Sequence, residues 1–160
     1  MAPPPDQDVP SIPALLRWAR SCYGEAIGSQ LARAGFDDLP RNGPFVLGGM
    51  AHWGGSAAEM IDGLGVTKQA ASQLIDTLVL RGYLAREINP EDRRRMSIEL
   101  TERGRAAAAA VRSAIESVDD DLAARLTLSE LSGLRAGLTA LTEIREQRAA
   151  RHHHHHHDDD

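Results

Sequence analysis

The chain has 160 residues, 42% of them hydrophobic and 4% aromatic, which suits one domain or a small domain with a helical arm. Its formal net charge of −5 indicates no general attraction to polyanions. No segment approaches the roughly 20 apolar residues of a membrane helix, and the proline-rich start lacks an apolar signal segment, so we expect a cytoplasmic protein with no membrane partner.

The first quarter of the chain predicts a leader and two helices. Residues 1–10 are rich in proline and are expected to be disordered. A helix is expected from Ser11 to about Gly35, and after a loop a short apolar helix over residues 45–53. Apolar residues recur at helical spacing along the first of these helices: Leu15, Leu16, Ala19, Tyr23, Ile27 and Leu31.

Two further short helices follow, joined by a tight turn. Ser56 and Glu59 form an S-x-x-E capping box, which predicts a helix beginning there and ending near residues 63–65. Thr67 can cap the next helix, which is expected to reach about Arg81. On a helix, three polar side chains of this segment fall opposite its apolar ones. They are Gln69, Ser72 and Gln73.

Two short strands are expected next, over residues 83–89 and 96–101, with turn residues between them. Two short helices followed by a β-hairpin are the layout of a winged helix-turn-helix. Amide side chains on the second helix can hydrogen-bond base edges in the major groove. Thr67 and Lys68, at the start of that helix, suit a DNA phosphate.

The expected hairpin tip carries Asp92 and three consecutive arginines, Arg93, Arg94 and Arg95. Most charge runs are merely solvated. Guanidinium groups, however, gain strongly in a narrow minor groove or against phosphates, and these lie beside the predicted recognition helix. Residues 66–105 hold eight basic and six acidic residues, whereas residues 113–150 hold four and seven. The local charge therefore favours DNA binding by the middle of the chain.

The last third predicts two long helices. Thr101 can cap an alanine-rich helix to about Arg125, and the capping box of Thr127 and Glu130 begins a final helix to about Arg148. Its leucines are too many for a lone helical arm to leave exposed, so we expect a homodimer. Residues 152–160, six histidines and three aspartates, are expected to be a purification tag.

The segment LGVTKQAASQLIDTLVLRGYLAREINPEDRRRMSIELTERGR resembles the core of the MarR family of transcriptional regulators. The family's D-x-R wing is matched by Asp92-Arg93-Arg94, and its L-T-x-x-G motif by residues 100–104. One departure lies in the first helix of the pair, where Ile61 stands in place of a small residue and Gly63 falls inside the expected helix.

The resemblance implies a mainly α fold with a small β-hairpin wing. It implies a winged helix-turn-helix over residues 37–101 and a helical dimerisation region over residues 11–36 and 102–150. By resemblance, Arg94 enters the minor groove, and a homodimer binds a pseudo-palindromic operator on double-stranded DNA. A repressor released by a small aromatic or anionic effector is the function implied, with no enzymatic activity and no cofactor.

An effector pocket is expected from the scarce aromatic residues and one histidine. Its candidates are Trp18, Tyr23, His52 and Trp53. The alternative for each residue taken singly is that it fills the core.

Cys22 is the only cysteine, and two alternative functions stay open. One is a redox-responsive regulator acting through Cys22, although we expect a buried structural thiol. The other is a dimeric helical interaction protein that binds no DNA. Outside the tag, one histidine and one cysteine are too few for the usual metal ligand sets, and no phosphate loop or nucleophile motif is found.

Overall fold

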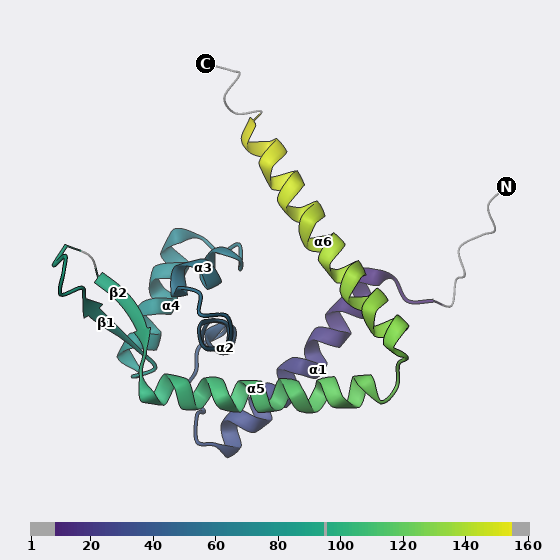
Figure 1. Cartoon of the computed structure of the whole chain (residues 1–160), viewed down its shortest axis with the longest axis horizontal. Helices are drawn as coiled ribbons and strands as arrows, with labels where there is room; N and C mark the ends of the chain where they lie inside the picture. Colours follow the sequence, from purple (N-terminus) through teal and green to yellow (C-terminus); the bar gives the residue numbers. More distant parts are fainter. Residues whose placement is uncertain (1–8, 95, 155–160) are drawn as a thin grey trace. The chain divides into compact units, whose positions relative to one another are not determined.

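A computed structural model describes residues 9–94 and 96–154. In this part of the chain, six helices and one two-stranded antiparallel sheet follow each other in the order α1–α4, β1–β2, α5–α6 (Figure 1). The expected fold class, mainly α with a β-hairpin, is confirmed. The chain divides after Val118 into two compact units, which are described separately here.

The first unit begins with four helices, α1 (Ile12–Arg33), α2 (Gly43–Trp53), α3 (Ala57–Asp62) and α4 (Lys68–Leu80). Three of these helices are capped by hydroxyl side chains, of which Ser56 and Thr67 were expected as caps. Each accepts the backbone N–H of the third residue after it: Ser11 from Ala14, Ser56 from Glu59 and Thr67 from Ala70, at 3.1–3.4 Å.

The helix-turn-helix of α3 and α4 differs from the sequence expectation at Gly63. This glycine does not lie inside α3 but is its C-cap, since the helix ends at Asp62. Gly65 provides the positive φ, 67°, that the turn requires. Ile61 is buried, at 4% exposure, so the larger side chain is packed into the core.

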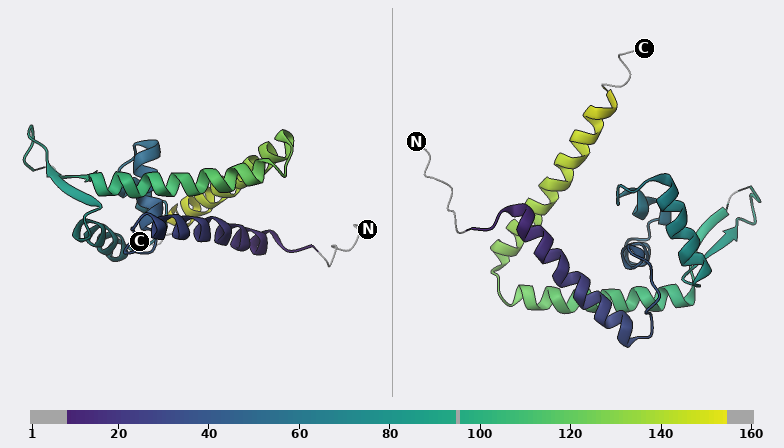
Figure 2. Two further views of the ribbon diagram at one scale, coloured as in Figure 1. Left: turned by 90° about the horizontal axis from the view of Figure 1, so that it is seen from below. Right: turned by 180° about the vertical axis from the view of Figure 1, so that it is seen from behind.

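The hairpin consists of β1 (Leu84–Ile88) and β2 (Met96–Leu100). Its register places Leu84 opposite Leu100 and Ile88 opposite Met96. Figures 1 and 2 show the hairpin projecting beyond the helices of the first unit. Its base packs on the protein, and its tip lies in solvent.

The core of the first unit lies between the helix-turn-helix and the beginning of α5 (Glu102–Ala123). Leu31 of α1 is also part of this core. The two segments expected to belong to a separate dimerisation region therefore contribute to the core beneath α4. Its most deeply buried large side chains are Val46, Leu47, Leu78, Tyr83 and Leu84.

Gly104 explains why α5 begins with the L-T-x-x-G sequence. A Cβ atom at this position would lie 2.0 Å from the Tyr83 carbonyl oxygen, so only glycine lets α5 approach the start of β1 so closely. Thr101 fixes the same junction. Its hydroxyl donates to the Gly82 carbonyl at 2.6 Å and accepts the Gly104 N–H at 3.0 Å.

The second unit contains the end of α5 and the helix α6 (Leu128–His154). The predicted capping box is confirmed: Glu130 accepts the Thr127 N–H and Thr127 accepts the Glu130 N–H, each at 3.1 Å. The hydrogen bond from the Thr127 backbone lowers the pKa of Glu130. The helix runs six residues beyond the expected end at Arg148. No helix in the described ranges is long and apolar enough to cross a bilayer.

Candidate nucleic-acid interface

Helix α4 has one packed face and one exposed polar face. Leu74 and Leu78 are buried in the core, and Ala71 and Ile75 are half-buried beside them. On the opposite side, four polar side chains are exposed: Gln69, Ser72, Gln73 and Asp76. The first three are the residues predicted to face the major groove. The structure presents them together on one surface, with Thr67 and Lys68 exposed at the beginning of the same helix.

The hairpin is fastened to this polar face. Arg86 of β1 donates a hydrogen bond to the Asp76 carboxylate and forms an ion pair with it. Both side chains are well exposed, so the pair adds little to stability and mainly fixes geometry. It also offsets the one negative charge on the exposed face of α4.

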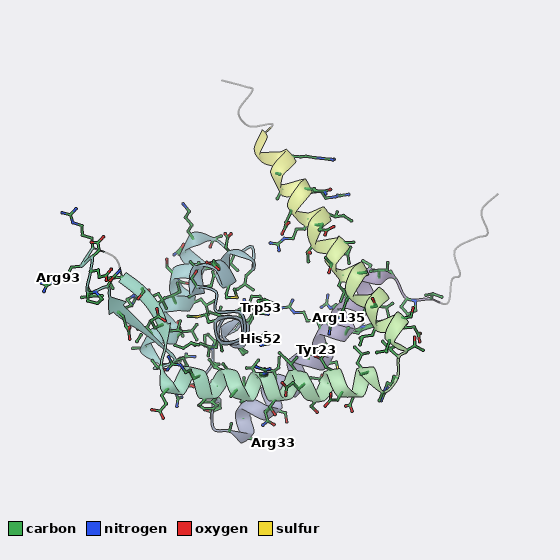
Figure 3. The ribbon with its side chains drawn as sticks, in the orientation of Figure 1. Tyr23, Arg33, His52, Trp53, Arg93 and Arg135 are labelled. Atoms are coloured by element: carbon green, nitrogen blue, oxygen red, sulfur yellow. The ribbon has the colours of Figure 1, made fainter. Side chains whose placement is uncertain are left out.

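The hairpin tip carries the charges expected of it. Arg93 and Arg94 are exposed, and Figure 3 shows Arg93 at the tip, directed away from the helices. The Asp92 carboxylate accepts the backbone N–H of Arg94 at 3.1 Å, which shapes the turn that presents the arginines. Arg95, the third predicted contact, lies outside the described residues.

Beneath the hairpin lies a cluster that sequence reasoning missed. We call Phe36, Asp38, Tyr83 and Arg103 the Tyr83 cluster. The Tyr83 hydroxyl donates to the Asp38 carboxylate. Arg103 donates to Asp38 at 3.1 Å and to the Tyr83 hydroxyl at 3.0 Å. The Arg103 guanidinium also lies 4.6 Å from the centre of the Tyr83 ring, and Phe36 meets that ring edge-on at 6.1 Å.

The Tyr83 cluster joins three segments of the first unit, and Arg81 adds a fourth. Phe36 and Asp38 follow α1, Tyr83 precedes β1, and Arg103 lies in the first turn of α5. Arg81, just after α4, donates to the Asp38 backbone carbonyl. The cluster thus ties the C-terminal end of α4 and the base of the hairpin to the segment that follows α1.

The same contacts shift two ionisation equilibria. The hydrogen bond from Tyr83, together with the positive charge of Arg103, lowers the pKa of Asp38. Burial of the ring, and then the hydrogen bond to Asp38, raise the pKa of Tyr83. Asp38 is therefore a carboxylate and Tyr83 a neutral donor at physiological pH.

The predicted effector residues line neither of two hollows found beside α1 in the first unit. The rings of His52 and Trp53 lie 6.1 Å apart at the end of α2, whereas Tyr23 lies on α1 (Figure 3). Trp18 is 60% and Trp53 71% exposed. The alternative that these residues fill the core is therefore wrong for the two tryptophans and for exposed His52, and Tyr23 is only half-buried.

Cys22 is exposed on α1, so the expectation of a buried thiol is also wrong for the single chain. No group of three or more His, Cys, Asp or Glu residues is arranged to hold a metal ion within the described ranges.

Both hollows are lined by residues of α1, and we call the two together the α1 groove. The first, about 320 Å³, has apolar walls that include Ile27, Leu31, Phe36 and Leu39, with Asp37 at its edge. The second, about 690 Å³, is bounded by Leu16, Arg17, Arg20, Ser21 and Arg41. None of the three arginines forms an ion pair with another residue of the described ranges. No periodic pattern in the sequence indicates the groove, because one wall is an irregular loop.

The comparisons with known proteins agree with this arrangement. The family model described as the MarR family matches residues 46–95, which run from α2 to the hairpin tip. No curated protein sequence matches the chain.

Solved structures similar to this chain share the fold at 20% sequence identity. S. aureus MepR in complex with DNA has a TM-score of 0.67 and covers 85% of this chain and 99% of its own. S. aureus MepR bound to ethidium bromide has a TM-score of 0.53, covering 84% and 96%. The apo form of wild-type E. coli MarR has a TM-score of 0.57, covering 84% and 98%. The chain therefore has the fold of these MepR and MarR structures, and its residues 46–95, from α2 to the hairpin, match the model of the MarR family.

Proposed function

We propose that the chain is a homodimeric transcriptional regulator that binds a pseudo-palindromic operator on double-stranded DNA. We further propose that it is a cytoplasmic repressor, released by a small molecule. One observation carries the proposal. The exposed amide face of α4 is held by the Arg86–Asp76 pair beside a hairpin whose tip presents arginines.

Each part of this surface suits a different part of a duplex. A helix of the size of α4 fits the major groove, where Gln69 and Gln73 can pair with the edges of adenine bases. The N-terminal end of α4, with Lys68, suits a phosphate. The hairpin then reaches the neighbouring minor groove with Arg94. The solved complex of MepR with DNA supports this assignment through the shared fold.

The test is a titration of the intact protein with duplexes selected from a random library. Arg94→Ala should weaken binding by about 1–3 kcal/mol if the side chain fills a minor groove. Arg112→Ala is the matched control, because Arg112 is an exposed arginine on α5, paired with Glu116 away from the hairpin. Equal affinity of the wild type and the Arg94 variant at physiological salt would remove the hairpin from the interface.

Base reading can be separated from phosphate contact in the same assay. Gln69→Ala and Gln73→Ala should relax the sequence preference more than they lower the affinity for unrelated duplexes. A uniform loss on all duplexes would show instead that these amides contact the backbone.

For the effector we propose the α1 groove instead of the four aromatic residues. Its apolar half offers Ile27, Leu31 and Phe36, and its other half offers three arginines, so it suits an elongated molecule with one anionic end. Asp37 lies at the apolar end and would repel a second anionic group there. Ligand binding by MepR, solved with ethidium bromide, supports a small-molecule site in this fold.

Three probes of equal chain length test the site by calorimetry. Decanoate should bind more tightly than decan-1-ol, which lacks the charge, and more tightly than decanedioate, which brings a carboxylate to Asp37. Arg20→Gln should remove the advantage of decanoate over decan-1-ol, and Asp37→Asn should improve binding of decanedioate. Equal binding of all three probes would show that the groove does not recognise charge.

A further inference from the structure

The two faces of the hairpin differ in chemistry. Side chains alternate between faces along a strand, so the register places Arg86, Ile88 and Met96 on one face. On the other face the exposed side chains are Glu87, Ser97 and Glu99. One face is therefore apolar with a basic residue, and the other is acidic.

Burial falls steadily along the apolar face from the base of the hairpin to its tip. Leu84 is 1% exposed, and its partner Leu100 and the next residue, Ile98, are half-buried. Ile88 and Met96, paired with each other nearest the tip, are 62% and 60% exposed. The apolar face thus continues from the core toward the hairpin tip and ends in two large side chains that are mostly exposed in the described part of the chain.

This face lies on the same side of the molecule as the polar face of α4. Arg86 lies two residues before Ile88 on the same face of the hairpin, and it pairs with Asp76. Asp76 in turn lies beside Ser72 and Gln73 on the exposed polar face of α4. A duplex held against α4 would therefore meet the face with Ile88 and Met96. The opposite face, with Glu87 and Glu99, would be repelled by phosphates and must turn away from the duplex.

We propose that Ile88 and Met96 form an apolar contact with the deoxyribose wall between the major groove read by α4 and the minor groove reached by the hairpin tip. Deoxyribose is the apolar part of the backbone that lies between two such grooves, and the flanking Arg86 and Arg93 suit the phosphates on either side. The contact rests on the proposed DNA binding and deepens it. It supplies affinity that depends neither on salt nor on base sequence.

The experiment compares salt dependence in two variants of the full chain. Ile88→Ser/Met96→Ser should weaken binding to a selected duplex about tenfold, because apolar area is no longer buried, while the slope of log Kd against log salt stays unchanged. Arg93→Ala, which removes a proposed phosphate contact, should lower the steepness of that slope by about one. Glu87→Gln/Ser97→Ala is the matched control on the acidic face and should bind as tightly as the wild type, or slightly more tightly.

Each other outcome overturns the proposal. Wild-type affinity in the Ile88→Ser/Met96→Ser variant would show that DNA does not cover this pair. A change in salt slope would show that the substitutions disturb the arginines instead. A lower thermal midpoint or a loss of dimer would show that the pair packs against protein. If the wild type binds no duplex, both the proposed function and the apolar contact are wrong. If the wild type binds and the Ile88→Ser/Met96→Ser variant binds equally well, only the apolar contact is wrong.

Discussion

The apolar side chains of the winged helix-turn-helix and those of the helices at the two ends of the chain differ in their exposure. In the former, Leu47, Leu78 and Leu84 are at most 1% exposed. On α6, taken by itself, Leu134, Leu138, Leu141 and Ile144 are each 40–46% exposed. The winged helix-turn-helix completes its core within one chain, whereas the terminal helix does not. The difference indicates that the terminal helix needs a covering surface from outside the chain, which the proposed homodimer would supply.

Helix α1 has both an exposed apolar part and a buried apolar part. Its first half exposes Ile12, Leu15 and Trp18, at 48–65%, whereas Leu31 near its end is buried in the core of the first unit. The exposed residues of α1 recur at helical spacing, and so do those of α6. The homodimer proposed above would cover these apolar faces, because a second copy of the chain offers the same faces in return.

The largest effect is expected from removing α6. Deleting residues 127–150 should abolish dimerisation and specific DNA binding together, because a single module binds too weakly to select one site. The two modules of a dimer would read half-sites about 10 bp apart or a multiple of that. Light scattering measures the first effect, and the duplex titration measures the second.

A substitution within α6 distinguishes loss of the dimer from misfolding of the truncated chain. Leu134→Glu/Leu141→Glu places charges on the exposed apolar face and should give the same two losses with an unchanged circular dichroism spectrum. A mass near 17.3 kDa for the intact wild type at micromolar concentration would contradict the homodimer.

A smaller effect, on the stability of the first unit, is expected from Gly104→Ala. The new Cβ would collide with the Tyr83 carbonyl oxygen and should lower the free energy of unfolding by roughly 3 kcal/mol, the upper end for overpacked sites. Gly133→Ala is the matched control on α6, where a Cβ meets no atom within 4 Å. Chemical denaturation measures both, and equal stability of the two variants would contradict the close approach of α5 to β1.

Local sequence signals predicted the elements well because each is encoded over a few residues. Ser56, Thr67 and the Thr127–Glu130 capping box begin helices where expected. The alternation in β2 and the polar arc of α4 likewise follow from short-range periodicity. The misplaced Gly63 shows the limit, since a glycine can lie inside a helix or cap it, and only packing decides.

Contacts between distant residues were not predictable in this way. Asp38 and Arg103 are 65 positions apart, and nothing in either neighbourhood marks them as partners. The sequence interpretation was also wrong about the exposure of three side chains, Cys22, Trp18 and Trp53. Residue type indicates an average tendency to be buried, but it does not tell which face of a helix the rest of the protein covers. Long-range pairing and side-chain exposure depend on the whole fold.

The smallest expected effect concerns the Tyr83 cluster, which joins the end of α1 to the winged helix-turn-helix. Because folding lowers the pKa of Asp38 below its ordinary value of 3.8, the carboxylate stabilises the fold at neutral pH. This contribution is lost as the pH falls through the lowered pKa, when the unfolded chain already binds the proton.

Asp38→Asn keeps an acceptor for Tyr83 but removes the charge, so it should be less stable than the wild type at pH 7, and the difference should vanish in acid. Thermal melts from pH 3 to pH 7 measure the two curves, and Tyr83→Phe should shrink the difference between them, since the hydroxyl is the main cause of the shift. Parallel curves over the whole range would show that Asp38 does not link α1 to the hairpin through its charge.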